Sequence, residues 1–482
     1  MAAEVITFVV LAVVGVGHFG WVDGAKITAA FAVAYIVPSL ILRRVRGTSV
    51  TAHCVLLLLT LLIIYTNYGR LTYFTFFDGY SLALPKLGGD AYLYYKYALS
   101  LYDSNVDCHG VIFPGLSWFM LGLWKVLGLS VVWPMAMNMM FTLTTATLTG
   151  LTTRRLLSHR VKVSPEALVA GGILLFSLLT YNYLVSTRLI KEGPVGCAMS
   201  MAAFALASMT AGERERQHQW RDFILFALAC VIVALVRTTY LYFILVGIVF
   251  MTLPHLRRDW RLAGGMVIAF ALCFLLGNWA AAYSIGRHAE IIGGGWNMQR
   301  VFFSSESQQF YHDMLNGYFL GPVWRKLLLL PVTVSVQFII PLPWMYDDTP
   351  HVITALGRFT YGWYFIGGTA LFYYLFLSWR KHEGMGMWPW WVAVCYACIA
   401  YLMAGTVARY VIPIQPLFIP VTMYVLCRLH EGRWRKPYAL WMIALVIVLA
   451  TTLLLCLEIQ QAAVSKYFHT RPWAPTLRSW LS

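Results

Sequence analysis

A few charged residues interrupt an otherwise apolar chain, and their types suit chemistry on an anionic substrate. Only 12% of the 482 residues are charged, whereas 60% are hydrophobic. Asp90, Lys191, Glu192 and Arg237 each stand within or at the end of an apolar run. A carboxylate can accept a proton from an attacking hydroxyl or amine, and basic side chains bind phosphate oxygens. Their combination predicts a site for a phosphate-linked substrate.

Each of these residues also has a purely structural interpretation. Asp90 precedes a helix-compatible, tyrosine-rich run, and aspartate is a preferred helix N-cap. Lys191 and Glu192 could form a solvated helix end, because Gly193-Pro194 is typical of a break between helices. Arg237 is harder to explain in this way, since it interrupts an apolar stretch of about thirty residues, where a charge is costly.

Composition and run length together define the class of protein. Apolar runs recur along the whole chain, and most approach the roughly 20 residues that cross a bilayer as a helix. This pattern excludes a soluble globule and does not show the short alternating segments of a membrane barrel. We therefore expect an all-α, polytopic membrane protein with about thirteen spans, organised as one domain over residues 1–482.

The basic residues between runs predict the topology. The net charge of +16 is explained by lipid anchoring and by the positive-inside rule, so nucleic acid is not an expected partner. Arg43, Arg44 and Arg46 mark the cytoplasmic end of the second run, which places the loop around Asp90 outside. We expect no cleaved signal peptide, an N-terminus inside and a C-terminal tail outside.

Two large extracytoplasmic loops follow from this topology, at residues 69–130 and 284–357. Residues 111–129 are apolar enough to span, but a span there would put Arg154, Arg155 and Arg160 outside. We therefore expect an interfacial helix, broken by Pro114-Gly115. The same topology brings further basic residues, Arg188, Arg287 and Arg409, to the outer face, although Arg409 could also anchor its helix by snorkelling.

Cofactor use is not predicted with any specificity. His288, His312 and His351 with Glu290 and Glu306 leave a divalent metal open, but they lack the helical spacing of a histidine pair. The nine cysteines lie mostly in apolar runs and are interpreted as packing residues. Gly293–Gly295 lacks the lysine of a phosphate loop, which favours a flexible substrate loop.

The order of these features resembles the GT-C glycosyltransferases, in the branch of bacterial aminoarabinose transferases and dolichyl-phosphate-mannose–protein mannosyltransferases. Five segments carry the resemblance over most of residues 50–430. They are Asp90-Ala91-Tyr92-Leu93-Tyr94, Phe113-Pro114-Gly115-Leu116, Ser186-Thr187-Arg188-Leu189-Ile190-Lys191-Glu192, Ala234-Leu235-Val236-Arg237-Thr238 and Ala408-Arg409-Tyr410-Val411-Ile412-Pro413-Ile414-Gln415-Pro416. Each segment is weakly specific alone, whereas their order and spacing together are more so.

The resemblance implies transfer of a sugar from a polyprenyl-phosphate donor to a lipid or glycan acceptor on the extracytoplasmic face. Asp90 would be the general base and Glu192 a second catalytic-site carboxylate that positions its partners. The donor phosphate would contact basic residues at the outer face, namely Lys191, Arg237, Arg409, Arg188 and Arg287. Tyr94, Tyr410 and His288 would contact substrate. The bacterial cytoplasmic membrane is the expected location, and cell-envelope glycan synthesis the expected process.

The chain also departs from this branch, and two other classes stay open. Asp90 has no adjacent acidic residue and no His-Pro-Pro-Leu segment follows it, which disfavours protein O-mannosylation. An O-antigen-type polymerase or ligase would instead centre its chemistry on residues 287–326. A transporter or flippase of lipid-linked sugars would carry charges at the bilayer midplane and often internal repeats, whereas here the charges gather at one face.

Overall fold

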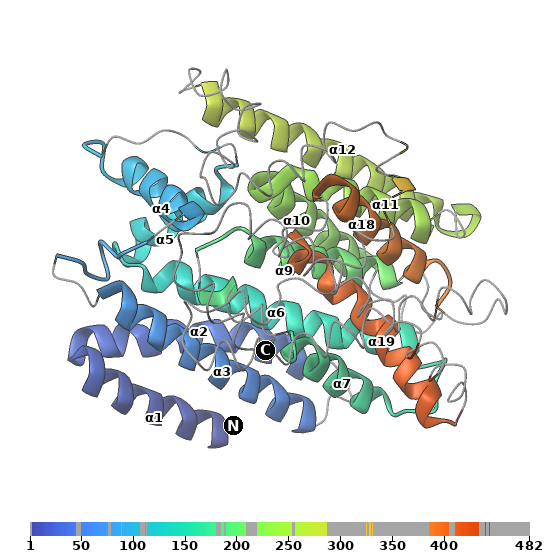
Figure 1. Cartoon of the computed structure of the whole chain (residues 1–482), viewed down its shortest axis with the longest axis horizontal. Coiled ribbons are helices and arrows are strands. Elements are labelled where there is room, and N and C mark those ends of the chain that lie inside the picture. The colour runs from blue at the N-terminus through green and yellow to red at the C-terminus, as the bar shows by residue number, and fades with distance from the viewer. Residues whose placement is uncertain are drawn as a thin grey trace, which may run out of the picture.

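The chain folds as a helical bundle, seen in a computed structural model (Figure 1). The structure describes residues 2–44, 50–75, 79–87, 89–106, 111, 113–179, 185–187, 189–208, 219–252, 256–286, 385–403 and 410–432, with isolated positions at 324, 327, 328, 330, 374, 439 and 443. Within these ranges every regular element is a helix. The predicted all-helical class is confirmed.

The helices fall into two length classes. The longer ones are α1 (Ala2–Phe19), α2 (Trp21–Arg44), α3 (Val50–Thr75), α6 (Val132–Leu157), α10 (Gln219–Arg237) and α12 (Leu256–Gly286). The shorter ones are α4 (Gly89–Tyr102), α5 (Gly115–Leu127), α7 (Pro165–Ser177), α9 (Glu192–Ala207), α11 (Leu241–Thr252), α18 (Trp388–Met403) and α19 (Gln415–His430). Two 3₁₀ turns, η3 (Thr238–Tyr240) and η8 (Ile412–Ile414), precede α11 and α19.

Five segments in the described part of the chain are long and apolar enough to cross a membrane. They are Trp21–Arg44, Val50–Thr75, Trp220–Thr252, Ala263–Ala280 and Ile412–His430. This number supports a membrane protein, while the predicted total of about thirteen spans stays a prediction. The expected spans over residues 359–377 and 440–457, and nearly all of the loop over residues 284–357, lie outside the described residues.

Two apolar helices are shorter than a membrane span. α7 ends at Ser177 after 13 residues. α5 is also 13 residues long, so it reaches only about 20 Å at 1.5 Å per residue. That is less than the roughly 30 Å of a bilayer core, and the interfacial position of residues 111–129 stays a prediction.

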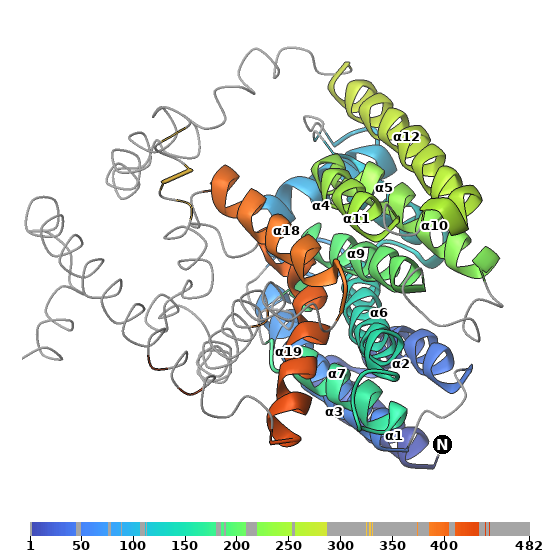
Figure 2. The same ribbon diagram turned by 90° about the vertical axis from the view of Figure 1, so that its right-hand side faces the viewer.

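α6 lies at the centre of the bundle, between α2 and α3 on one side and α9 and α10 on the other (Figures 1 and 2). It is rich in threonine, and successive hydroxyls donate to the carbonyl four residues earlier, as in Thr142 to Asn138 and Thr145 to Phe141. This internal pairing satisfies several of the buried hydroxyls of α6, whereas those of Thr147 and Thr152 have no hydrogen-bond partner within the described part of the chain. At its crossing with α7, Gly150 and Gly172 let the two backbones touch.

Close contacts show the relative directions of α10, α11 and α12. Phe223 near the start of α10 approaches Gly265 on α12, and Ala234 near its end approaches Gly277, so these two helices are parallel. Thr238 also approaches Gly277, whereas Tyr242 at the start of α11 meets Phe274, three residues earlier on α12, so α11 returns antiparallel to α10. The chain therefore turns back at η3, next to the charge that interrupts the apolar sequence at Arg237.

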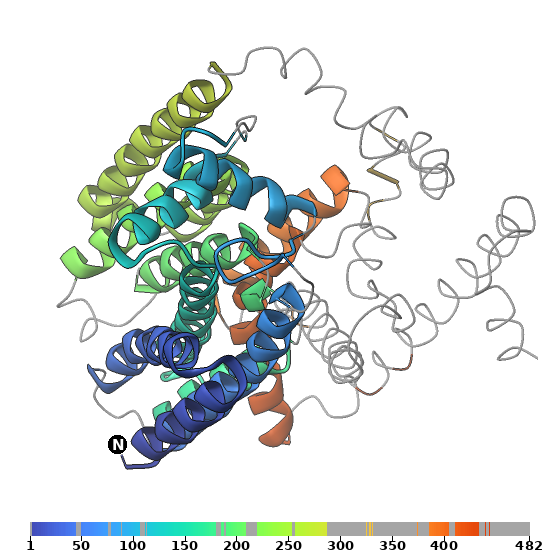
Figure 3. The same ribbon diagram turned by 90° about the vertical axis from the view of Figure 1, so that its left-hand side faces the viewer.

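α12 closes one edge of the bundle, with α1 at the opposite edge (Figure 3). Its outward stripe includes Trp260, Leu272, Leu275 and Trp279, all of them exposed. The two tryptophans are 19 residues apart, which corresponds to about 28 Å along a helix. Tryptophan prefers both membrane interfaces, so this stripe has the length and composition of a surface that faces lipid across one bilayer.

Candidate functional site

A buried ion pair joins the start of α9 to the end of α10. Arg237 Nη1 lies 3.2 Å from Glu192 Oε1, and the two side chains are 10% and 1% exposed. Glu192 is the first residue of α9, where the positive end of the helix dipole favours a carboxylate. Charges buried to this extent are tolerated only when paired. We call the bundle end that contains this pair the site end.

Arg237 is held in place by two tyrosines as well as by Glu192. Its guanidinium carbon lies 4.1 Å from the centre of the Tyr410 ring and 5.3 Å from that of Tyr240. Tyr240 in turn donates a hydrogen bond of 2.6 Å to the Tyr410 backbone carbonyl. The planar guanidinium therefore has a fixed orientation, set by η3 and by the segment that leads into η8.

The backbone at Arg237 explains why a charge interrupts this apolar segment. Arg237 has φ −165° and ψ 85°, an extended conformation that ends α10 before η3 begins. The helix ends there and the chain reverses, so the side chain is directed from the last turn into the interior of the site end. The charge that interrupts the apolar sequence at Arg237 thus marks the end of a helix, and the charge is paired with Glu192.

Lys191 precedes Glu192 and approaches two aromatic rings from a different part of the chain. Its ammonium nitrogen lies 5.6 Å from the centre of the Tyr94 ring and 5.4 Å from that of Phe113. An ammonium group within about 6 Å of a ring centre is attracted by the ring face. Lys191, Tyr94 and Phe113 are called the lysine cage below.

Asp90 lies in the first turn of α4, not in an irregular loop, and it is partly buried. It stands four residues before Tyr94, so the two side chains occupy the same face of the helix, one turn apart. That face carries the Tyr94 ring toward Lys191. Helix geometry therefore places the Asp90 carboxylate next to the lysine cage.

Two hydrogen bonds fix α4 in this position. Ser117 Oγ on α5 donates to the Tyr94 carbonyl over 2.9 Å, and Tyr95 Oη donates to the Ala83 carbonyl over 2.7 Å. Burial raises the pKa of the Tyr95 phenol, so this hydroxyl keeps its proton and remains a donor at any physiological pH. α4 and α5 thus form a rigid pair that presents Asp90 and Tyr94.

Close backbone contact joins α4 and α5 to the ion pair. A Cβ on Gly115, the first residue of α5, would lie only 2.5 Å from the Leu235 carbonyl oxygen. Leu235 is two residues before Arg237, so the start of α5 rests on the last turn of α10. The lysine cage and the ion pair are therefore built on helices that touch.

A second buried ion pair lies at the other end of the same helices. Arg155 Nη1 on α6 lies 3.2 Å from Asp222 Oδ1 on α10, and it also donates to the Phe204 carbonyl of α9 over 2.9 Å. The Arg155 guanidinium stacks on the Phe204 ring at 3.9 Å. This pair links three helices. Unlike the site end, its surroundings show no second cation between two aromatic rings among the described residues.

The site end therefore gathers two carboxylates and two cations from three separate segments. Asp90 is accessible to solvent in part, whereas Glu192 is committed to Arg237. The arrangement can bind an oxyanion and accept a proton. Within the described ranges, no group of three or more histidine, cysteine, aspartate or glutamate side chains is placed to hold a metal ion.

The predicted site residues divide into two groups. The structure brings together Lys191, Glu192, Arg237, Tyr94 and Tyr410, and helix geometry adds Asp90. Arg188, Arg287, His288 and Arg409 lie outside the described residues, as do His312, His351, Glu290 and Glu306.

Two contributors had no role in the prediction. Phe113 stood in the proline-containing segment before the interfacial helix, and Tyr240 lies three residues after Arg237. Aromatic rings commonly cover cations, but nothing in the sequence near Phe113 or Tyr240 indicates which cation each ring contacts.

Comparison with known proteins finds no matching family model, no matching curated protein and no matching solved structure.

We expect Glu192→Gln to reduce the free energy of unfolding by about 3 kcal/mol, because removal of one partner leaves the Arg237 guanidinium buried without a counter-charge. The measurement is unfolding of the purified protein in mixed micelles. Asp23→Asn is the matched control, since the Lys26–Asp23 pair is exposed and 3.7 Å long, and such pairs contribute about 0–1 kcal/mol. Equal stability of Glu192→Gln and the wild type would contradict the assigned pairing.

We expect Gly115→Ala to lower stability by about 1–3 kcal/mol, because its Cβ forces α5 away from the Leu235 carbonyl. Gly122→Ala on the same helix is the control: nothing lies within 4 Å of its added Cβ, and alanine favours the helix by about 0.5–1 kcal/mol. Thermal unfolding of both variants checks the contact. The α5–α10 packing described here is wrong if the two variants behave alike.

Proposed function

We propose that the protein is an integral-membrane glycosyltransferase that moves a sugar from a polyprenyl-phosphate donor to a lipid or glycan acceptor. The observation that carries the proposal is the convergence, at one end of the bundle, of a buried Arg237–Glu192 pair, a caged Lys191 and a partly exposed Asp90.

The donor phosphate would bind between Lys191 and Arg237. Glu192 contacts Nη1 of the Arg237 guanidinium, which carries five N–H donors in total. Lys191 adds a second cation, which lies against the Tyr94 and Phe113 rings. As the bond from sugar to phosphate breaks, negative charge grows on the phosphate, and cations fixed in advance stabilise that charge.

Asp90 would act as the general base. In the reaction, the acceptor hydroxyl attacks the anomeric carbon, a new C–O bond forms, and the bond from that carbon to the phosphate oxygen breaks. The hydroxyl proton passes to the Asp90 carboxylate, and polyprenyl phosphate leaves with the electron pair. Attack from the side opposite to the phosphate inverts the anomeric carbon.

Glu192 has a different role from Asp90 in this account. Its side chain is 1% exposed and bonded to Arg237, so it is a positioning residue that orients the guanidinium. Asp90 is the more exposed carboxylate. Tyr94, one turn later on the same face of α4, has its ring against the Lys191 ammonium group. The environments of the two carboxylates therefore separate the base from the positioning group, although both were candidates for catalysis by sequence.

The distribution of charge supports an extracytoplasmic site. Arg154 and Arg155 lie in the last turn of α6, opposite the site end, with Arg160 three residues beyond the helix, and Arg428 lies near the end of α19. The positive-inside rule assigns basic helix ends to the cytoplasm. The site end then faces the other side of the bacterial cytoplasmic membrane, where polyprenyl-linked sugars serve envelope glycan synthesis.

The position of the charges also favours a transferase over a transporter. Glu192, Arg237 and Lys191 all stand at helix termini at one end of the bundle, whereas a transporter binds its substrate near the bilayer midplane through broken helices. A site at the membrane boundary suits a lipid-linked donor, because the phosphate and sugar reach it while the hydrocarbon chain stays in the bilayer.

We expect Asp90→Asn to lower the rate of sugar transfer at least 100-fold, the usual contribution of a positioned general base, while donor binding is retained. The measurement is transfer from radiolabelled polyprenyl-phosphate sugars in membranes. Asp222→Asn, in the ion pair at the other end, is the control for lost stability: transfer per folded molecule should be unchanged. Undiminished transfer by Asp90→Asn at wild-type expression would remove Asp90 as the base.

A further inference from the structure

Gln415, the first residue of α19, is a fully buried amide. Its side chain is 0% exposed, and neither its Oε1 nor its Nε2 has a hydrogen-bond partner within the described part of the chain. A buried polar atom without a partner costs about 1–3 kcal/mol, and buried polar groups are nearly always paired in folded proteins. An amide with both ends unpaired therefore points to a ligand that pairs with it.

The Gln415 amide lies close along the chain to the site end. Gln415 follows Tyr410 by five residues, and η8 lies between them. A 3₁₀ turn rises about 2 Å per residue, so the two residues are at most about 10 Å apart along the chain axis. Tyr410 stacks on Arg237. The separation is therefore comparable with the length of a phosphate that carries one monosaccharide.

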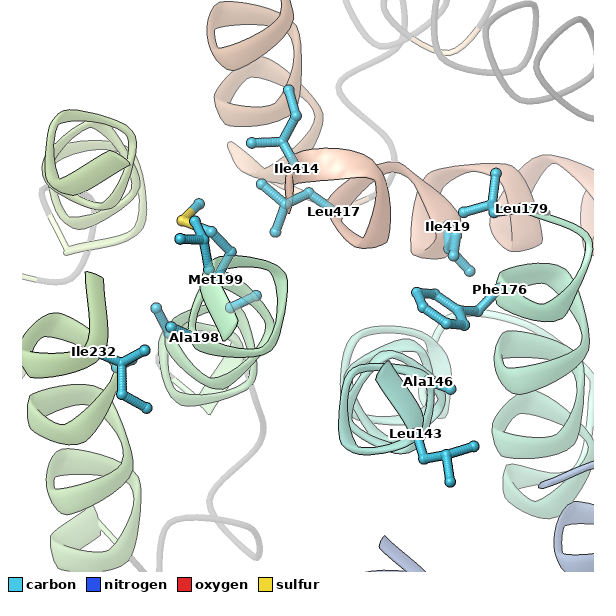
Figure 4. Close-up of a cluster of buried hydrophobic side chains, with 14 of the residues drawn as sticks. Leu143, Ala146, Phe176, Leu179, Ala198, Met199, Ile232, Ile414, Leu417 and Ile419 are labelled. Carbon is cyan, nitrogen blue, oxygen red and sulfur yellow. The ribbon is translucent and has the colours of Figure 1, made fainter. Parts of the chain in front are cut away.

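The neighbouring face of α9 supplies a second polar group. A Cβ on Gly196 would lie 3.7 Å from the Pro413 Cα, and Met199 lies beside Ile414 and Leu417 (Figure 4). This face of α9 thus packs on η8 and the start of α19. Ser200 is one turn beyond Gly196 on the same side of the helix, and its buried Oγ has no hydrogen-bond partner in the described ranges.

The chemistry of these groups defines the ligand class. An amide offers both donors and acceptors, and a hydroxyl offers one donor and two lone pairs. Neither carries charge, so a neutral ligand rich in hydroxyls suits them, whereas a second phosphate or a metal ion would need charged partners. The aromatic ring of Tyr410, which stacks on Arg237 five residues before Gln415, suits the apolar face of a sugar ring.

We propose that Gln415, with Ser200, recognises hydroxyl groups of the transferred sugar and determines which sugar the protein accepts. The inference rests on the proposed function, since the donor phosphate at Lys191 and Arg237 sets the position of the sugar. A site built to hydrogen-bond a hydroxyl discriminates strongly against a ligand that lacks it, because its own buried groups are then left unpaired. Gln415 is thus a specificity residue and takes no proton in the reaction.

The test compares Gln415→Met with the wild type, using full-length protein in nanodiscs. Methionine has nearly the volume of glutamine and no amide, so the variant is expected to fold with equal or higher thermal stability. The probes are decaprenyl phosphate alone and decaprenyl phosphate carrying mannose, glucose, galactose or arabinose. The measured quantity is the ratio of the affinity for the best sugar-loaded lipid to the affinity for the bare lipid phosphate.

We expect Gln415→Met to lower this ratio about 10- to 100-fold, about tenfold for each hydrogen bond lost to the sugar, with affinity for the bare lipid phosphate unchanged. Ser200→Ala should lower it about tenfold. Thr422→Val is the matched control, because this buried residue of α19 already donates to the Phe418 carbonyl; its ratio should equal that of the wild type.

The outcomes separate this inference from the proposed function. A wild-type protein that prefers a sugar-loaded lipid, with the same preference in Gln415→Met, overturns the role of Gln415 and leaves the phosphate site intact. A wild-type protein that binds none of the lipid phosphates overturns the proposed function and this inference with it. A variant that loses affinity for the bare lipid phosphate as well shows that Gln415 is structural.

Discussion

The buried pair of Arg237 and Glu192 is the interaction on which the arrangement of the site end depends. Each charge is removed from water, so neither is tolerated without the other, and the two helix termini that carry them must meet. The pair also fixes α10 at the point where η3 turns the chain back into α11. Tyr410 stacks on the guanidinium, which brings the start of α19 to the same place. One electrostatic requirement thus aligns segments that are more than 200 residues apart in sequence.

Close helix contacts convert this alignment into a surface that can bind a substrate. Gly115 lets α5 rest on the last turn of α10, and α5 in turn holds α4 through the Ser117–Tyr94 hydrogen bond. The result places a partly exposed carboxylate, a caged ammonium group and a paired guanidinium at one end of the bundle. Affinity for phosphate then comes from cations that are already oriented, so little reorganisation is needed when charge develops on a leaving group.

Much of this arrangement was predictable from sequence, for identifiable reasons. Helical class follows from composition, and the turn at Arg237 follows from a charge in an apolar run. Asp90 was assigned to a polar loop, yet it begins α4, because short polar segments give no clear periodic signal. Contacts between distant segments were not predictable: nothing local to Phe113, Tyr240 or Gln415 indicates which side chain each one approaches. The ends of α5 and α7 were not predictable for a related reason, since apolar sequence continues past the residue at which each helix ends.

The most direct test of the central claim is a cryo-EM structure of the full-length protein in nanodiscs with decaprenyl phosphate bound. The account predicts that the phosphate group lies at the site end, within hydrogen-bond distance of the Lys191 ammonium group and the Arg237 guanidinium, with the Arg237–Glu192 pair intact. A phosphate bound instead near Arg155 and Asp222 at the other end of the bundle, or a site end without lipid phosphate at saturating concentration, would contradict it.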